Sequence, residues 1–211
     1  MAVLQSGKPL VSVIIPAYNH ERFIEAAMDS VLQQSMEDLE LIVVDDGSTD
    51  TTLEKIRSYG DKRVRSFTQE NQDAFNTINR GISLACGKYL AILNSDDVYA
   101  KNRLENLLLA QKERDTVCLF TDVIPISDLG EIFSDVHFGW NIWHSNNRIY
   151  YEQVEDLYRA FLHGNFMVTT SNLFMTAEAV KTVGSFCSSR YFHDYDYILR
   201  MLLSFPGKVR Y

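Results

Sequence analysis

Basic residues are scarce in this sequence. The 20 lysines and arginines stand against 28 aspartates and glutamates, so the formal net charge of the chain is −8. Nucleic-acid phosphates require a basic surface, and the acidic balance therefore argues against nucleic acid as a partner. Carboxylates are preferred ligands of hard divalent cations, so the same balance is compatible with a metal site.

Long hydrophobic runs are also missing. No apolar stretch reaches the roughly 18 residues that a membrane-spanning helix needs. Residues 1–9 are too short and too polar for the core of a secretory signal. Hydrophobic residues still form 46% of the 211-residue chain, which suffices for one buried core. We expect one domain over residues 1–211, cytoplasmic and without a membrane span, with peripheral membrane association left open.

Cysteine is equally sparse. Cys86, Cys118 and Cys187 lie far apart in the sequence. This spacing matches neither a disulfide framework nor a cysteine zinc site. We expect buried free thiols in a reducing compartment.

The first part of the chain alternates apolar runs with helical patterns. The runs predict strands at 11–16, 39–44, 64–68, 89–93 and 117–123. Helical spacing predicts helices at 21–34, 53–59, 75–85 and 104–108, and Gly87 is expected to be a left-handed helix cap. The alternation predicts βαβ units and a mostly parallel sheet with helices on both faces.

The second half is less regular. Residues 130–147 lack clean periodicity and predict a long loop or an irregular hairpin. Helices are expected at 152–163, 177–183 and 194–205, and a strand at 167–175.

Polar turns follow three of the predicted strands: PAYN at 16–19, DDGS at 45–48 and NSDD at 94–97. In a parallel sheet the carboxyl ends of the strands share one edge, and ligands bind there. We therefore predict a functional site along this edge.

Asp96 and Asp97 are adjacent carboxylates at the end of a buried strand, which is costly unless a positive charge neutralises them. A divalent cation bridging to a diphosphate would do so and would stabilise a leaving nucleoside diphosphate. A turn that caps the next helix explains these residues equally well. Asp46 fits either a contact to a nucleoside or a capping loop. Tyr18, taken alone, is better explained by packing than by stacking on a base.

Asp194 and Asp196 lie in the first turn of the last predicted helix, where the helix dipole stabilises carboxylates. Asp194 precedes Ile198 by four residues and Met201 by seven, so it shares their inward face. Asp196 lies roughly 200° from Asp194 around the helix. Asp194 is therefore the better candidate for a general base, and the adjacent His193 is more simply explained as structural.

Six stretches together resemble the family 2 inverting glycosyltransferases of the GT-A fold. They are VSVIIPAYN at 11–19, LELIVVDDGSTDTT at 39–52, QEN at 69–71, NRGISLACGKYLAILNSDD at 79–97, TTSNLFMTAEAVKTVGSF at 169–186 and HDYDYILRM at 193–201. Their order and spacing are specific, although no single stretch is. The resemblance implies an α/β GT-A fold with a Rossmann-like donor-binding half at about 9–123 and an acceptor-side half at about 124–211.

The resemblance also implies roles on the donor side. Pro16 and Tyr18 would line the nucleobase pocket, with Tyr18 stacked on the base, and Asp46 would hydrogen-bond the base. Asp96 would contact the ribose or the diphosphate and share in the metal site. Asp97 would be the main ligand of Mn²⁺ or Mg²⁺.

The catalytic aspartate of the family corresponds to Asp194, which would deprotonate the acceptor hydroxyl for a single inverting displacement. The implied enzyme is a metal-dependent hexosyl- or N-acetylhexosaminyltransferase. It would take its sugar from a nucleoside-diphosphate sugar, with a UDP-sugar favoured. The acceptor would be a saccharide or a lipid-linked saccharide in polysaccharide or glycoconjugate assembly.

Three positions depart from the family pattern: Asn94 replaces a frequent first aspartate, Asp73 a common glycine, and His193 the usual glutamate before the catalytic aspartate. The end of the chain in a predicted strand suggests a catalytic domain cut from a longer protein. The segment 138–151 would then be the acceptor-side loop. Its four large aromatic residues fit stacking on a sugar and filling a small satellite core equally well: Trp140, Trp143, Tyr150 and Tyr151.

Other functions fit the sequence less well. A nucleotidylyltransferase would carry a glycine-rich basic loop after the first strand, where this chain has PAYNHERF. A dinucleotide-dependent oxidoreductase would carry G-x-G-x-x-G after a strand. A non-catalytic nucleotide-sugar or carbohydrate-binding module is the main alternative, and retention of Asp96, Asp97 and Asp194 counts against it.

Overall fold

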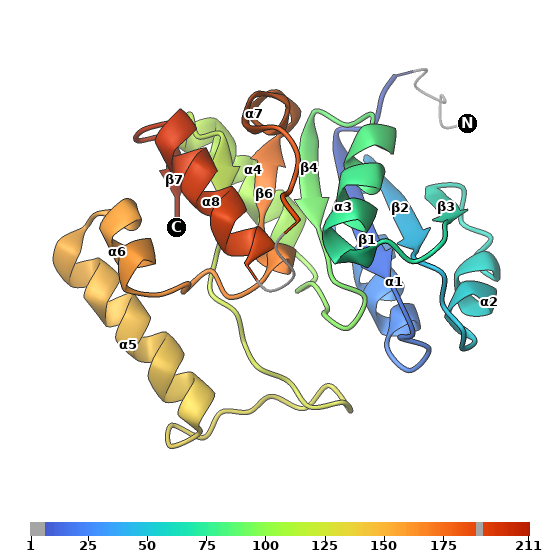
Figure 1. The fold of residues 1–211 in the computed structure, drawn as a ribbon, viewed down its shortest axis with the longest axis horizontal. Helices are drawn as coiled ribbons and strands as arrows, with labels where there is room; N and C mark the ends of the chain where they lie inside the picture. The colour runs from blue at the N-terminus through green and yellow to red at the C-terminus, as the bar shows by residue number, and fades with distance from the viewer. Residues whose placement is uncertain (1–6, 189–191) are drawn as a thin grey trace.

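The computed structural model describes residues 7–188 and 192–211, which form a seven-stranded sheet between two layers of helices (Figure 1). Residues 1–6 of the polar N-terminal segment lie outside this range. The strand order is β3-β2-β1-β4-β6-β5-β7. The strands are β1 (Val11–Ala17), β2 (Leu39–Asp45), β3 (Val64–Thr68), β4 (Tyr89–Ile92), β5 (Cys118–Leu119), β6 (Phe174–Thr176) and β7 (Val209–Arg210).

The predicted mostly parallel sheet is confirmed. β1 pairs in parallel with β2 and β4, and β2 pairs in parallel with β3. β6 runs antiparallel between β4 and β5. In β1, Val13 and Ile15 face one helical layer while Ile14 faces the other, and all three are fully buried. Burial of both faces explains why this strand is a continuous apolar run.

Helices cover both faces of the sheet. One layer holds α1 (Ile24–Leu32), α2 (Thr52–Arg57) and α4 (Arg103–Arg114). The other layer holds α3 (Asp73–Leu84), α7 (Ala177–Val183) and α8 (His193–Ser204). In the described part of the chain, no helix has the length and apolar character needed to cross a membrane.

The acceptor-side half differs from the sequence expectation. The predicted loop at 130–147 is wrong over its second part, because α5 (Gly139–Val154) is a regular helix. Aromatic and polar residues lie all around this helix, and only the polar residues His144 and Asn147 are buried. The sequence of α5 therefore shows no apolar stripe that would predict a helix. The predicted helix at 152–163 is the end of α5 followed by α6 (Leu157–His163). The two helices pack together beside the sheet (Figure 1).

Two predicted strands are shorter than expected. The strand at 117–123 is limited to β5, because the backbone of Thr121 bonds to the side chain of Asn172 instead of a neighbouring strand. The strand at 167–175 is replaced by the 3₁₀ helix η1 (Thr170–Asn172) and the short β6.

The expectation of buried free thiols is correct for Cys118, which is buried and free and whose pKa is raised by burial. Cys86 is exposed and Cys187 is half-buried.

Gly87 does not cap α3 in a left-handed conformation. The helix ends at Leu84, the following Ala85 has an extended backbone, and Gly87 is required for close approach to β1. A Cβ atom at Gly87 would lie 2.6 Å from the backbone nitrogen of Ser12, and the Gly87 N–H donates to the Ser12 hydroxyl.

Gly87→Ala is therefore expected to lower the free energy of unfolding by about 1–3 kcal/mol, because backbone atoms must shift to admit the methyl group. Urea unfolding measures the change. Gly60 is a matched control, since nothing lies within 4 Å of the Cβ position there. Equal stability of the Gly87→Ala and Gly60→Ala variants would contradict the close-approach explanation.

Candidate active site

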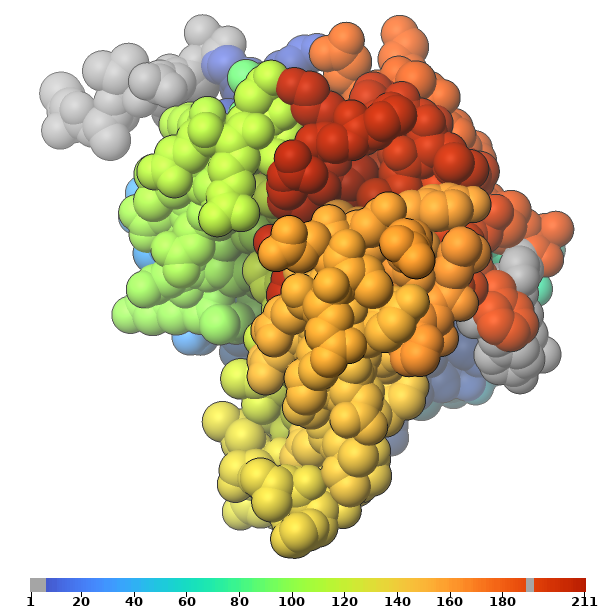
Figure 2. Space-filling model, turned by 90° about the vertical axis from the view of Figure 1, so that its left-hand side faces the viewer, coloured from blue at the N-terminus to red at the C-terminus, as the bar shows by residue number. Residues whose placement is uncertain are grey.

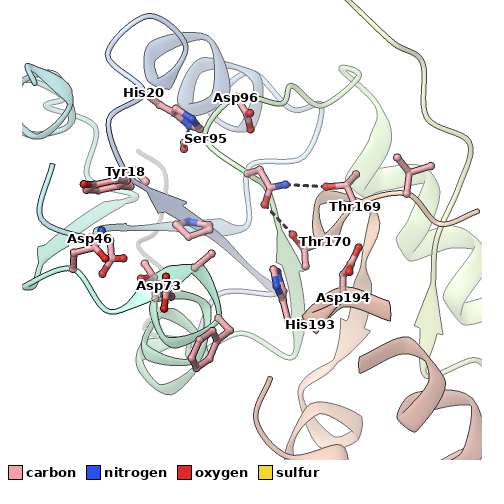
Figure 3. A pocket seen from close by; sticks show the side chains of 18 residues that line it. Tyr18, His20, Asp46, Asp73, Ser95, Asp96, Thr169, Thr170, His193 and Asp194 are labelled. Carbon is pink, nitrogen blue, oxygen red and sulfur yellow. Dashed lines mark hydrogen bonds between the residues drawn. The ribbon is translucent and has the colours of Figure 1, made fainter. Parts of the chain in front are cut away.

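A cleft of about 670 Å³ opens at the carboxyl edge of the sheet, where β1 and β4 end (Figure 3). β2 lies on one side of β1 and β4 on the other, so the connections diverge here, as at the ligand sites of other open parallel sheets. The cleft is lined by Pro16, Ala17, Tyr18, His20, Asp46, Asn71, Asp73, Ala74, Phe75, Thr77, Asn94, Ser95, Asp96, Val168, Thr169, Thr170, His193 and Asp194.

The predicted gathering of strand-end residues at one edge is confirmed. Pro16, Tyr18, Asp46, Asp96 and Asp194 all line the cleft, although they come from four separate parts of the chain. The Tyr18 side chain is 45% exposed, so it is not held in the core. Their roles toward a ligand stay predictions.

Asp46 is only 3% exposed and is held from one side. Its Oδ1 accepts hydrogen bonds from Gln69 Nε2 at 2.6 Å and from the Gln72 backbone N–H at 3.0 Å. Arg80 in turn donates to Gln69 Oε1 at 2.9 Å. Gln69 of the QEN segment and the backbone of Gln72 thus fix the orientation of Asp46 at the cleft wall.

The first two strand-end turns are bonded to each other. The backbone N–H of Asn19 donates to Ser48 Oγ at 3.0 Å, and Asn19 Oδ1 accepts from the Thr49 N–H at 2.8 Å. The His20 ring hydrogen-bonds Ser95 Oγ at 2.6 Å, which joins this pair to the third turn. The three turns form one connected wall.

Asp97 lies beside the residues that line the cleft, and hydrogen bonds from the 3₁₀ helix η1 and from Thr169 just before it hold its side chain. Its Oδ2 accepts a hydrogen bond of 2.6 Å from Ser171 Oγ, with longer contacts of 3.5 Å to Asn94 Nδ2 and Thr169 Oγ1. Burial raises the pKa of Asp97 despite the Ser171 hydrogen bond, and the charge of Asp96 adds to the rise.

A divalent cation fits this site only if it shares its ligands with a bound molecule. The described residues contain no cluster of three or more histidine, cysteine, aspartate or glutamate side chains suited to a metal ion. Asp96 is exposed at the cleft, and Asp97 is half-buried beside it, with its Oδ2 bonded to Ser171. One or two carboxylates completed by phosphate oxygens and water are the usual environment of Mg²⁺ at nucleotide sites.

The loop that supports Asp97 is anchored by Asn172, which is 2% exposed. Asn172 Oδ1 accepts from the Thr121 N–H at 2.9 Å and from Arg103 at 3.1 Å. Its Nδ2 donates to the carbonyls of Thr121 and Met167. Asn94 is fixed from the same loop through Thr169 and Thr170 (Figure 3).

Asp194 lies at the start of α8 and lines the cleft, as its helical position predicts. Its Oδ2 accepts from Asn165 Nδ2 at 3.1 Å. Asp196 instead pairs with Arg200 at 2.7 Å on another side of the helix. His193 also lines the cleft, and its Nδ1 is buried with no hydrogen-bond partner among the residues that the structure describes.

Several lining residues were not identified from the sequence as site residues. His20 and Thr170 carry no pattern that distinguishes them from ordinary turn residues. Asp73 stands where the family commonly has glycine, and the structure explains that glycine, because the φ angle at Asp73 is +69°. This left-handed conformation favours glycine and strains other residues.

The charge of the cleft is one-sided. Asp46, Asp73, Asp96 and Asp194 line it, whereas no lysine or arginine is among its described lining residues. A diphosphate would meet net repulsion here unless a cation came with it. The open α/β sheet thus carries an acidic cleft at its β1–β4 edge, the position at which such sheets bind ligands.

Comparison with known proteins identifies the family. The sequence pattern of glycosyl transferase family 2 matches residues 12–176, and the chain belongs to this family. An uncharacterised glycosyltransferase of Rickettsia typhi is 33% identical over 92% of this chain and 59% of its own length. A Bacillus subtilis glycosyltransferase named for teichuronic acid biosynthesis is 42% identical over 56% of this chain and 48% of its own length. This chain thus spans less than two thirds of either relative.

Solved structures show that the fold is GT-A. TarS of S. aureus, residues 1–349 in complex with UDP-GlcNAc, has a TM-score of 0.70 at 19% identity and covers 94% of this chain and 54% of its own. A Pyrobaculum calidifontis mannosyltransferase in complex with GDP-Man and Mn²⁺ has a TM-score of 0.70 at 18% identity and covers 97% of this chain and 55% of its own.

Asp97→Asn is expected to keep the fold and to be at least as stable as the wild-type protein at neutral pH. Because the pKa of Asp97 is raised on folding, its ionisation destabilises the folded state above that pKa, and this cost disappears below the pKa of aspartate in the unfolded chain. The stability difference between variant and wild type should therefore vanish in acid.

Urea unfolding at neutral and acidic pH measures this difference, with Glu70→Gln, which removes one exposed charge that does not act on Asp97, as the control. An Asp97→Asn protein that is less stable than the wild type only at neutral pH would contradict the proposed cost of burial.

Proposed function

We propose that this domain is a metal-dependent inverting glycosyltransferase that moves a hexosyl or N-acetylhexosaminyl group from a nucleoside-diphosphate sugar to a hydroxyl of a saccharide or lipid-linked saccharide. The observation that carries this proposal is the acidic cleft at the carboxyl ends of β1 and β4, with four aspartates and no cationic lining residue among those described. A cleft of this kind binds a diphosphate only together with a cation.

The donor side is assigned to the β1–β4 edge and residues 9–123. Tyr18 has its exposed ring available for stacking on a base, next to Pro16, and Asp46 is held ready to accept hydrogen bonds from the base. A UDP-sugar is the favoured donor, supported by the UDP-GlcNAc bound to TarS, while the Pyrobaculum enzyme binds GDP-Man.

Asp97 and Asp96 would hold Mn²⁺ or Mg²⁺ together with the donor diphosphate. The Mn²⁺ in the Pyrobaculum complex supports this assignment. When bound, the cation supplies Lewis-acid stabilisation to the leaving diphosphate. The protein contributes the fixed position of Asp97, through Ser171 and the anchored 3₁₀ helix.

Asp194 is the proposed base of the acceptor half, residues 124–211. Its carboxylate takes the proton of the acceptor hydroxyl while that oxygen forms a bond to the anomeric carbon. The bond between this carbon and the diphosphate oxygen breaks at the same time, and the nucleoside diphosphate leaves with the electron pair. Asn165 orients the carboxylate.

Polysaccharide assembly is the proposed setting, supported by the name of the Bacillus subtilis relative. A non-catalytic nucleotide-sugar or carbohydrate-binding module remains the second candidate, because the same cleft could bind a donor without transfer. The two differ in turnover and not in donor binding.

A thermal-shift panel of UDP, GDP, CDP and dTDP, each with and without Mn²⁺, tests the donor site. One diphosphate, with UDP favoured, should raise the melting temperature by about 5–10 °C at a hundredfold excess over its Kd, and only with metal. Asp97→Asn should remove this rise. No stabilisation by any of the pairs would overturn the donor-site assignment.

Asp194→Asn tests the mechanism. This variant should keep the metal-dependent shift with the diphosphate and lose about 10²–10⁴-fold in release of nucleoside diphosphate from the donor sugar. Asp196→Asn, in the same helical turn but paired with Arg200, should retain normal turnover. Near-normal turnover of Asp194→Asn would refute the base assignment, and absence of turnover in the wild-type protein with donor bound would favour the binding module.

A further inference from the structure

A second hollow, which shares no lining residue with the cleft, lies between the segment 122–138, called the arm here, and the first turns of α5. Figure 2 shows the arm and α5 projecting from the body of the molecule. The hollow, called the arm groove, has a volume of about 660 Å³ and a mixed lining of apolar, aromatic, amide, hydroxyl and charged side chains.

The structure divides the four aromatic residues that the sequence left undecided. Tyr150 stacks on His163 and Tyr151 stacks on Phe166. Both tyrosines are partly buried against the hydrophobic cluster that includes residues of α6. Trp140 lines the arm groove, whereas the exposed Trp143 does not. The first pair thus fills a satellite core, whereas Trp140 lines the groove while one side of its ring stacks on His144.

His144 supplies a buried polar atom to the same groove. Its side chain lies flat against Trp140, with ring centroids 4.9 Å apart and planes 6° apart, and it is 7% exposed. Its Nε2 has no hydrogen-bond partner in the part of the chain that the structure describes, and the nearest carboxylate oxygen, on Asp122, is 3.8 Å away. A buried ring nitrogen without a partner is costly, and a ligand hydroxyl would satisfy it.

The charges around the groove favour a neutral ligand. Asp122 and Arg148 are paired at 3.0 Å, and burial lowers the pKa of His144, so the imidazole is uncharged at neutral pH. Outside the groove, Asp128, Glu131 and Asp135 are exposed on the arm. These carboxylates disfavour an anionic lipid surface.

The groove begins next to the active-site cleft. Thr121, directly before Asp122, exchanges backbone hydrogen bonds with the Asn172 side chain of the loop that forms the cleft wall. The far end of the arm reaches the start of α1, where Asp128 pairs with Arg22 at 3.0 Å. The arm therefore runs from the end of β5 to the start of α1, on the side of the molecule toward which β1 and β4 point (Figure 1).

We propose that the arm groove binds neutral sugar residues of a saccharide chain, with Trp140 stacked against a sugar face and His144 Nε2 bonded to a hydroxyl. Sugar rings present apolar C–H faces and many hydroxyls, which matches an aromatic platform beside amide and hydroxyl side chains. The idea that the bound saccharide is the acceptor rests on the proposed transferase function. The binding of a saccharide to the groove does not depend on that function.

The test is binding of the wild-type protein, without donor or metal, to a broad array of neutral and acidic oligosaccharides from disaccharides to hexasaccharides. We expect binding to neutral chains, with affinity increasing with length. Trp140→Ala should weaken it about tenfold, equivalent to about 1.4 kcal/mol. Asn146→Ala, which removes an exposed amide of the groove lining, should weaken it several-fold without disturbing packing.

Trp143→Ala is the matched control, since it removes an exposed tryptophan of the same helix outside the groove. It should bind like the wild-type protein, and all variants should keep the wild-type circular dichroism and nucleotide response. No binding of the wild-type protein to any glycan, equal loss in Trp140→Ala and Trp143→Ala, or Trp140-dependent binding to phosphatidylglycerol vesicles alone would each overturn the proposal. Glycan binding without a nucleotide response would overturn only the transferase function.

Discussion

The buried amide of Asn172 exchanges hydrogen bonds with both backbone groups of Thr121 and also meets Arg103 from α4. Removing it would leave several polar groups unpaired in the interior, each at a cost of about 1–3 kcal/mol. This one side chain joins three parts of the molecule, namely the end of the short strand β5, the 3₁₀ helix behind Asp97 and the beginning of the arm. The two halves of the molecule are therefore joined by polar contacts next to the cleft, in addition to the apolar packing of the sheet.

The sequence predicts a strand or a helix only where burial of its side chains produces a recognisable pattern of apolar residues. Strands β1, β2 and β4 are buried on both faces and read as continuous apolar runs, so the sequence predicts them and their parallel order. Helix α5 is buried at only two polar residues, His144 and Asn147, so its sequence carries no stripe. The helix does pack against α6, and such a contact is not visible in local sequence patterns.

The candidate site divides in the same way. Strand-end position and helical phase suffice to place Tyr18, Asp46 and Asp194 at one cleft. The supporting contacts are not predictable in this manner, because Ser171 reaches Asp97 across 74 positions and Asn165 reaches Asp194 across 29. Such partners are ordinary polar residues in loops, and only the folded geometry distinguishes them. The family resemblance indicates which residues to propose for the chemistry, while the structure shows the contacts that hold these residues in place.

Asp73 holds a left-handed backbone conformation at the cleft wall, a conformation that costs a non-glycine residue about 1–2 kcal/mol. Selection of variants for heat resistance alone would drive this position toward glycine. The same step would remove one of four negative charges around the cleft and so change its attraction for cations. Stability and the charge of the cleft are thus coupled at one residue, so selection for one changes the other without any substitution at Asp96 or Asp97.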